Sequence, residues 1–213
     1  MTYHQRKQER QELNAYLLSQ EWNVFGTLKF VNGRTIGRES ANKLLRSYWN
    51  KIDRVIYGRA AERQNMRVPR WCFAHEGVDH ENFHVHFVMP SPLQDTEHMC
   101  CLLNAVWAQH HTQTAPLAKN WIMPAQDRAA VVSYVTHEYW RLGSSTIADE
   151  LSWHTQHLNT FAHETSSEHY AEQQTRRIQR AASPLWLKQA QQALNTQQAQ
   201  YEASGDLQMM ERG

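Results

Sequence analysis

Two histidines stand at alternate positions of a short apolar stretch, residues 83–89 (FHVHFVM). Its aromatic and β-branched residues predict a strand. Side chains alternate across a strand, so His84 and His86 leave the same face. Neutral imidazole is a common metal ligand, and two of them on one face indicate a metal site. Alternating histidines also occur on half-exposed strands without any function, and that interpretation stays open for the pair alone.

The preceding residues supply a third ligand. A strand is predicted over residues 70–77, and residues 78–82 form a polar five-residue connection suited to a hairpin. With that loop, Glu76 faces His84, and directly opposed residues point to the same side of the sheet. The register therefore predicts three metal ligands: Glu76, His84 and His86. His75 is then expected on the core face, and a slip of one residue would exchange Glu76 for His75.

A second group of reactive residues lies in a predicted helix over residues 127–142. Tyr134 and His137 are three positions apart, so they share a helical face. Tyr139 lies five positions after Tyr134, about 140° around the helix, and points away. A tyrosine oxygen becomes a nucleophile when a base assists, because its free pKa is near 10. Considered alone, such a tyrosine is more often a packed ring.

The elements that must position these residues follow a regular order. Hydrophobic periodicity predicts helices over residues 2–20, 40–57, 95–109 and 127–142, and strands over residues 22–31, 70–77, 83–89 and 119–123. From the first strand onward this order predicts an α+β fold: a βαββαβ split-βαβ (ferredoxin/RRM-like) antiparallel sheet with helices on one face. We expect the predicted metal ligands on the open face.

Three parts are expected along the chain. They are an N-terminal helix (residues 1–21), a catalytic domain (residues 22–160) and a helical, Gln-rich C-terminal extension (residues 161–213). A break at Ser183-Pro184 predicts two helices in the extension, which we expect to serve packing, self-association or duplex binding.

Composition places the chain among ordinary globular proteins, with 41% hydrophobic and 20% charged residues. No apolar run is long enough for a transmembrane helix, and the N-terminus is too polar for a signal peptide, so we expect a cytoplasmic location. The three cysteines lack CxxC spacing, which argues against a disulfide framework or a thiolate zinc site.

A net charge of +1 hides an uneven distribution. Between Arg34 and Arg70 ten basic residues stand against three acidic ones, whereas residues 138–168 hold five acidic residues and one basic residue. A domain polarised in this way can hold phosphates on one side. The predicted phosphate contacts are Lys29, Arg34, Arg38, Lys43, Arg46, Arg67 and Arg70. A solvated, arginine-rich helix face remains the alternative.

Together these motifs resemble those of the HUH endonuclease superfamily, in particular rolling-circle replication initiators (Rep) with a single catalytic tyrosine. The resemblance lies in a first strand over residues 25–30 (FGTLKF), the His-hydrophobic-His strand with Glu76 upstream, and Tyr134 in a later helix. His137 stands where the family usually has a lysine, and Tyr139 misses the spacing of the two-tyrosine subgroup by one residue. Conjugative relaxases of the superfamily place the tyrosine before the histidine strand, so the chain is similar to the replication and transposition branch.

The resemblance covers roughly residues 22–142 and implies an activity. That activity is metal-dependent, site-specific nicking and joining of single-stranded DNA through a 5′-phosphotyrosine intermediate, which initiates rolling-circle replication of a plasmid or phage. Tyr134 would attack with help from His137, and Mn²⁺ or Mg²⁺ would be bound by Glu76 and the two strand histidines. Two alternatives stay open: a transposase with the same chemistry, and a non-catalytic, sequence-specific DNA-binding protein.

The expected partners are single-stranded or hairpin origin DNA and a host helicase and polymerase, with no membrane. A host helicase is expected because the sequence contains no GxxxxGK[ST] motif of a fused helicase. A HIT-type nucleotide hydrolase is excluded, because Val88 occupies the place of its third alternating histidine.

Overall fold

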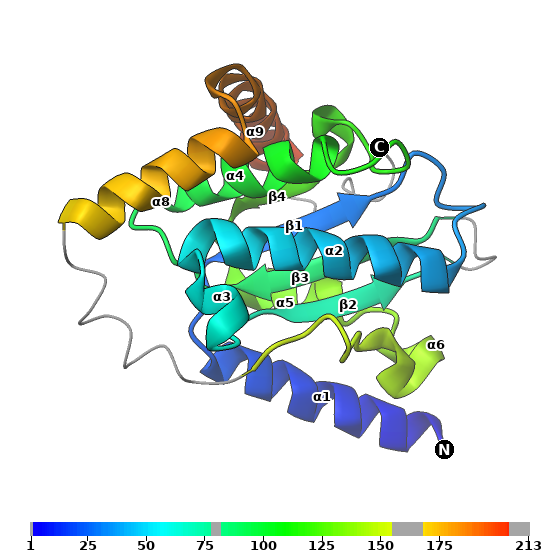
Figure 1. Ribbon diagram of the computed structural model, residues 1–213. Coiled ribbons are helices and arrows are strands. Elements are labelled where there is room, and N and C mark those ends of the chain that lie inside the picture. The colour runs from blue at the N-terminus through cyan, green and yellow to red at the C-terminus, as the bar shows by residue number, and fades with distance from the viewer. Residues whose placement is uncertain (1, 78–81, 155–167, 205–213) are drawn as a thin grey trace.

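Four strands form one antiparallel sheet in a computed structural model of the chain, which describes residues 2–77, 82–154 and 168–204. The strands are β1 (Val24–Lys29), β2 (Trp71–His75), β3 (His84–Met89) and β4 (Trp121–Pro124), in the spatial order β2-β3-β1-β4. Helices connect β1 to β2 and β3 to β4, as in a split-βαβ fold. The predicted α+β class is therefore confirmed (Figure 1).

One face of the sheet packs against α2 (Arg38–Tyr57) and α4 (Thr96–Ala108). The ring of Trp49 on α2 meets Phe87 of β3 edge-on, with 5.1 Å between centroids. A Cβ atom at Gly26 would lie 2.3 Å from the Phe87 ring, so only glycine fits at that point of β1. Large buried side chains on this face form most of the core.

The other face is covered by α5 (Arg128–Val135), which lies behind the sheet in Figure 1. Tyr134 of α5 packs edge-on against Phe25, and its ring centroid lies 4.7 Å from that of His86. Helix α1 (Tyr3–Ser19) lies on the outer side of α5 and packs against it. The prediction of an open histidine face was wrong, because the chain after β4 folds back across it.

The single helix predicted over residues 127–142 is two helices, α5 and α6 (Tyr139–Leu142), separated by a turn at residues 136–138. Asp127 caps α5, accepting a hydrogen bond from the backbone of Ala130 at 3.0 Å. Because of the turn, Tyr139 faces α1 and donates a hydrogen bond to Glu9 at 3.2 Å. The break brings the residues after Tyr134 back toward the sheet.

Short helices and the C-terminal part complete the fold. These elements are α3 (Ala60–Arg63), η1 (Leu117–Lys119), η2 (Gly143–Thr146), α8 (Glu168–Ala181) and α9 (Pro184–Ser204). The two C-terminal helices were predicted, whereas α3 was not. Tyr170 of α8 donates to the carbonyl of Ile56 at 2.9 Å, and α9 packs against α4. The predicted domain boundary after residue 160 and most of the predicted hairpin loop lie outside the described residues.

Within the described ranges, none of the helices combines the length and the apolar character needed to cross a membrane.

Candidate metal centre and tyrosine site

The pairing of β2 with β3 differs from the predicted register by one residue. His75 pairs with His84, and Phe73 pairs with His86, so His75 faces the same side as the two predicted ligands and Glu76 does not oppose His84. Ligand atoms of these histidines lie within 4.8 Å of one another. We call His75, His84 and His86 the histidine cluster.

A distant carboxylate binds the backbone directly after β2. Glu138 accepts hydrogen bonds from the backbone N–H groups of Glu76 and Gly77, at 3.3 and 3.2 Å, so those groups do not continue the ladder with β3. Gly77 has a φ of +71°, a left-handed conformation that favours glycine and turns the chain away from the sheet. Glu76 instead forms an ion pair with Arg38 at 3.4 Å. The carboxylate beside the cluster therefore comes from Glu138.

The ring orientations within the cluster are fixed by hydrogen bonds to one nitrogen of each imidazole. The Nε2 atom of His75 lies 2.8 Å from the carbonyl of Val135, and Nδ1 of His84 lies 2.7 Å from that of Asn82. A carbonyl only accepts, so each of these nitrogens carries the proton and the other keeps a lone pair. Such partners are typical of metal-bound histidines, because they fix the tautomer and the ring.

His86 is held in the same manner by β1. Its Nδ1 atom lies 2.8 Å from the hydroxyl of Thr27, and the two residues are register partners in the sheet. This contact directs Nε2 of His86 toward the interior of the cluster, 3.1 Å from Nε2 of His84. Thr27 is fully buried and belongs to the first-strand motif, which the sequence analysis recognised without assigning a role to this hydroxyl.

The unsatisfied nitrogen of His75 supports a fit to a cation. Among the described residues, Nδ1 of His75 is buried and has no hydrogen-bond partner, which is costly in a protein interior. The 3.1 Å contact between His84 and His86 matches one hydrogen bond. It also approaches the separation of about 3.3 Å between two nitrogens bound tetrahedrally to one cation at about 2.0–2.1 Å. A cation would satisfy all three lone pairs together.

Burial keeps the cluster neutral. It lowers the pKa of His84 to about 4 and holds the pKa values of His75 and His86 well below the ordinary range, with repulsion among the rings as a further cause. Lys29 is 4% exposed, faces the same side of the sheet as its partner His84, and lowers the pKa of His84 further. Neutral imidazoles are the form that binds metal ions.

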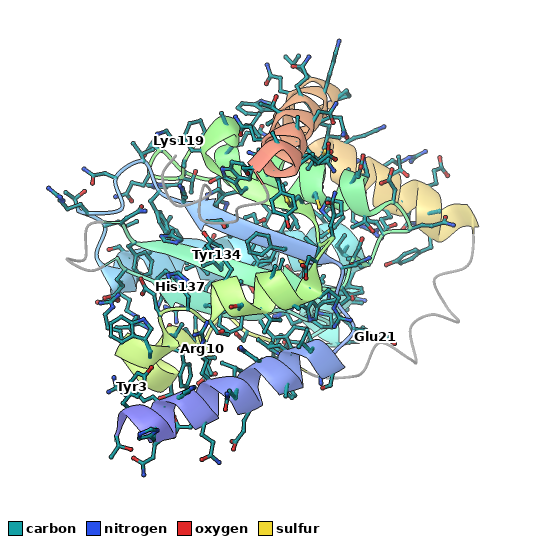
Figure 2. All side chains as sticks on the ribbon, turned by 180° about the vertical axis from the view of Figure 1, so that it is seen from behind. Tyr3, Arg10, Glu21, Lys119, Tyr134 and His137 are labelled. Atoms are coloured by element: carbon teal, nitrogen blue, oxygen red, sulfur yellow. The ribbon has the colours of Figure 1, made fainter. Side chains whose placement is uncertain are left out.

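The predicted nucleophile lies against this cluster. The Tyr134 ring is nearly parallel to that of His137, with 5.6 Å between centroids, and the His137 ring lies 4.6 Å from His75. Figure 2 shows both side chains beside α5, toward the sheet. Nδ1 of His137 lies 2.6 Å from the Tyr134 carbonyl and donates to it, so Nε2 is the nitrogen that can accept a proton.

Glu138 is a site residue that the sequence analysis did not identify. It is 8% exposed, and its carboxylate also accepts a hydrogen bond from Arg141 at 2.8 Å. A second group that could hold a metal consists of His75, His137 and Glu138. In the sequence Glu138 lies four positions after Tyr134, but its role depends on a contact with residues about sixty positions earlier.

The predicted phosphate contacts fall into different parts of the molecule. Lys29 lies on the cluster face, and Arg34 and Arg38 are exposed near its edge. Arg38 also donates to the carbonyl of Ser145 at 2.9 Å, beside α6. Lys43 and Arg46 are exposed on α2, which covers the opposite face of the sheet, so they do not lie beside the cluster.

Arg70 corrects the prediction made from charge alone. It is 5% exposed and makes two hydrogen bonds to Asp53, at 2.9 and 3.2 Å, while its guanidinium lies over Trp49 at 4.7 Å. Arg67 is half-buried and reaches the same carboxylate at 3.5 Å. Arg70 is therefore a structural partner of Asp53 and is not exposed to a strand at the surface.

Among the tryptophans described, Trp140 is the one with a large exposed surface, at 56%. It lies on α6, two residues after Glu138, and its carbonyl accepts a hydrogen bond from Arg6 at 2.9 Å. An aromatic side chain exposed beside cationic groups is suited to stacking on a nucleic-acid base.

Comparison of the chain with protein-family models, curated proteins and solved structures found no match in any of the three. The chemistry of the site must therefore carry the functional inference.

Proposed function

We propose that the protein is a metal-dependent endonuclease and strand transferase that nicks and rejoins single-stranded DNA, with Tyr134 as its nucleophile. One observation carries this proposal: the Tyr134 ring lies 4.7 Å from His86, within a cluster of three buried, neutral histidines. A tyrosine packed for stability alone does not require three buried imidazoles whose ring nitrogens lie within 4.8 Å of one another.

The histidine cluster would hold a divalent cation, and the buried Nδ1 atom of His75, which has no hydrogen-bond partner, is suited to be one of its ligands. When bound, the cation would stabilise the negative charge that develops on the oxygens of the scissile phosphate. The donor set is three nitrogens, because His75 replaces Glu76. Of the two predicted metals, Mn²⁺ suits nitrogen ligands better than Mg²⁺, which prefers oxygen.

Tyr134 and His137 divide the work of bond formation. The phenol oxygen of Tyr134 forms a bond to phosphorus, the bond from phosphorus to the 3′ oxygen breaks, and the departing oxygen takes up the proton that His137 has received from the phenol. The proton of the phenol passes to Nε2 of His137, whose other nitrogen is occupied by the Tyr134 carbonyl. The products are a 5′-phosphotyrosine and a free 3′-hydroxyl. Attack by another 3′-hydroxyl reverses the step and joins strands.

The strand would reach the site over the edge formed by the ends of β2 and β3. Arg34 and Arg38 would neutralise phosphates there, whereas the predicted contact Lys29 is as buried as Arg70 and stays beside the cluster, and Trp140 would stack on an unpaired base. We place this activity in the cytoplasm, in keeping with three buried, unbridged cysteines. Initiation of plasmid or phage replication, with a host helicase and polymerase, is the favoured role. A transposase would use the same chemistry.

A gel assay tests the proposal. The protein is incubated with Mn²⁺ and a pool of single-stranded and hairpin oligonucleotides, and denatured samples are examined for covalent adducts. Since the phosphate stays on tyrosine, a label at the 3′ end must remain with the protein and a label at the 5′ end must be released. Tyr134→Phe must abolish the adduct. Tyr139→Phe is the matched control, because its hydroxyl contacts Glu9 on the far side of α5, and must keep it.

A further inference from the structure

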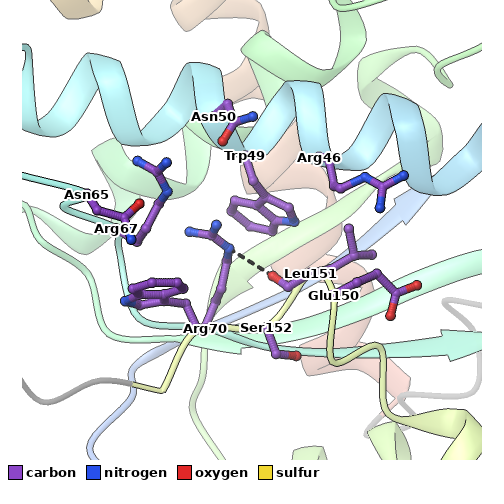
Figure 3. A pocket seen from close by; sticks show the side chains of 10 residues that line it. Arg46, Trp49, Asn50, Asn65, Arg67, Arg70, Glu150, Leu151 and Ser152 are labelled. Atoms are coloured by element: carbon purple, nitrogen blue, oxygen red, sulfur yellow. Dashed lines mark hydrogen bonds between the residues drawn. The ribbon is translucent and has the colours of Figure 1, made fainter. Parts of the chain in front are cut away.

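A pocket of about 220 Å³ lies at the other end of β2 from the histidine cluster. It opens between α2, the loop that follows α3 and the segment of residues 150–153 (Figure 3). Its walls carry guanidinium, amide and indole groups, contributed by Arg46, Asn50, Asn65, Arg67 and Trp153. Nothing in the proposed nicking reaction uses this pocket.

The floor of the pocket is rigid. Arg70 donates hydrogen bonds to Asp53 at 2.9 Å, to the carbonyl of Val68 at 2.8 Å and to the carbonyl of Leu151 at 3.1 Å. The last of these is the dashed line in Figure 3. Its guanidinium also stacks on Trp49, which is 1% exposed. A floor with this many contacts keeps its shape without a ligand.

The charge of the pocket suits one phosphodiester. Three guanidinium groups, of Arg46, Arg67 and Arg70, stand against the carboxylates of Asp53 and Glu150, which leaves one positive charge. A phosphodiester carries one negative charge, and guanidinium groups are its best side-chain partners. Asn50 and Asn65 add amide donors, and the half-buried Trp153 offers a ring on which a base can stack.

One continuous segment joins the pocket to the tyrosine site. The chain leaves Glu138 at the cluster and runs along the outer edge of β2, where Ala148 bonds to Cys72 at 2.9 Å and Trp153 bonds to Arg70 at 2.8 Å. Arg70 and His75 are five positions apart along β2, or about 17 Å at about 3.3 Å per residue. At about 3.4 Å per stacked nucleotide, that distance corresponds to about five nucleotides or fewer.

We propose that this pocket binds one nucleotide of the single-stranded DNA, up to about five nucleotides from the scissile phosphate. Its phosphate would lie on Arg46 and Arg67 and its base against Trp153. The inference rests on the proposed function, since it names a second contact of the same strand.

Strand affinity without metal tests the pocket separately from the nicking reaction. We would measure fluorescence anisotropy of a labelled mixed-sequence single-stranded oligonucleotide in EDTA, with Arg46→Glu and with Arg63→Glu as the matched control. Both arginines are exposed, and only Arg46 lines the pocket. We expect about tenfold weaker binding for Arg46→Glu and about twofold or less for the control. Trp153→Ala should weaken binding by about fivefold or more.

Equal affinities of Arg46→Glu and Arg63→Glu for the strand would overturn the inference. It would also be overturned if Arg46→Glu lost binding of thymidine monophosphate but kept that of the strand, because the pocket would then serve a free nucleotide. Adduct formation with wild-type protein is measured in parallel. An adduct with equal strand affinities contradicts the pocket alone, whereas a weakened Arg46→Glu without any adduct contradicts the nicking reaction alone.

Discussion

The Nε2 atom of His75 lies 2.8 Å from the carbonyl oxygen of Val135, the residue that follows Tyr134. This contact joins a strand that carries a metal-ligand candidate to the last turn of the helix that carries the nucleophile candidate. It fixes the tautomer of His75 and the position of Tyr134 together. The cluster and the phenol are therefore held as one unit, and changes in either should be felt in both.

Substitutions at His75 and Glu76 distinguish the observed pairing of β2 with β3 from the predicted one. In the observed pairing His75 lies with the other two candidate ligands, so His75→Ala should weaken Mn²⁺ binding by about a hundredfold or more, as measured by titration with electron paramagnetic resonance. Glu76→Gln is the control, because Glu76 pairs with Arg38, and should change the affinity by about twofold or less. A larger loss of Mn²⁺ affinity in Glu76→Gln than in His75→Ala would contradict the observed register and support the predicted one.

Thr27 should act as a positioning residue for His86. Thr27→Val keeps the shape and removes the hydroxyl that lies 2.8 Å from Nδ1 of His86. We expect about tenfold weaker Mn²⁺ binding, the usual effect of losing a partner behind a metal-bound histidine. Thr27→Ser, which keeps the hydroxyl, should restore the affinity. Equal affinities of the valine variant and wild type would show that Thr27 has no such role.

The stability of the metal-free protein should fall in acid. The pKa of His84 is about 4 in the folded state, against about 6.5 for an unfolded histidine. Below pH 6.5 the unfolded chain binds a proton that the folded protein excludes, so the free energy of unfolding decreases as pH falls. His84 alone should account for about 2 kcal/mol between about pH 7.5 and pH 5, measured by urea unfolding in EDTA. His84→Gln should remove this share of the pH dependence, while the lowered pKa values of His75 and His86 maintain the rest. A wild-type free energy of unfolding that stays constant over this range would contradict the burial argument.

Trp140 should contribute to DNA binding without contributing to stability. Because the side chain is 56% exposed, Trp140→Ala should leave the urea midpoint nearly unchanged. Loss of one stacked base should weaken binding of single-stranded DNA by about 1–3 kcal/mol in an anisotropy titration. Leu185→Ala on α9 is a control, because Leu185 is a similarly exposed apolar side chain, and this variant should bind single-stranded DNA with the wild-type affinity. Unchanged binding by Trp140→Ala would remove this residue from the proposed strand path.

The parts of the fold that depend on local pattern were predictable. Alternation over residues 83–89 predicted that His84 and His86 share a face, and Ser183-Pro184 predicted the break between α8 and α9. The third histidine, His75, was predictable only as the result of a one-residue slip, because loop length does not fix the register and the backbone after β2 is bound by Glu138, a residue distant in sequence. A carboxylate that captures two backbone donors leaves no periodic signal.

The burial of charged side chains was the other property that the sequence did not predict. A count of charges between residues 34 and 70 treats Arg70 and Arg34 alike, yet Arg70 is buried on Asp53 whereas Arg34 is exposed. Formal charge cannot distinguish the two, since the partner of Arg70 is brought to it by the packing of α2 on the sheet. The helix break after Val135 was missed for a similar reason, because Thr136 at the break contacts Asn14 of α1, a residue distant in sequence.

The most direct measurement is the location of a covalent nucleotide on the protein. Wild-type protein is incubated with Mn²⁺ and single-stranded DNA, digested with nuclease and protease, and analysed by tandem mass spectrometry. The predicted result is a nucleotide joined through its 5′ phosphate to Tyr134, and this adduct is absent when His75, His84 or His86 is replaced. A phosphonucleotide on Tyr139, or an adduct that forms equally well without the histidine cluster, would contradict the account.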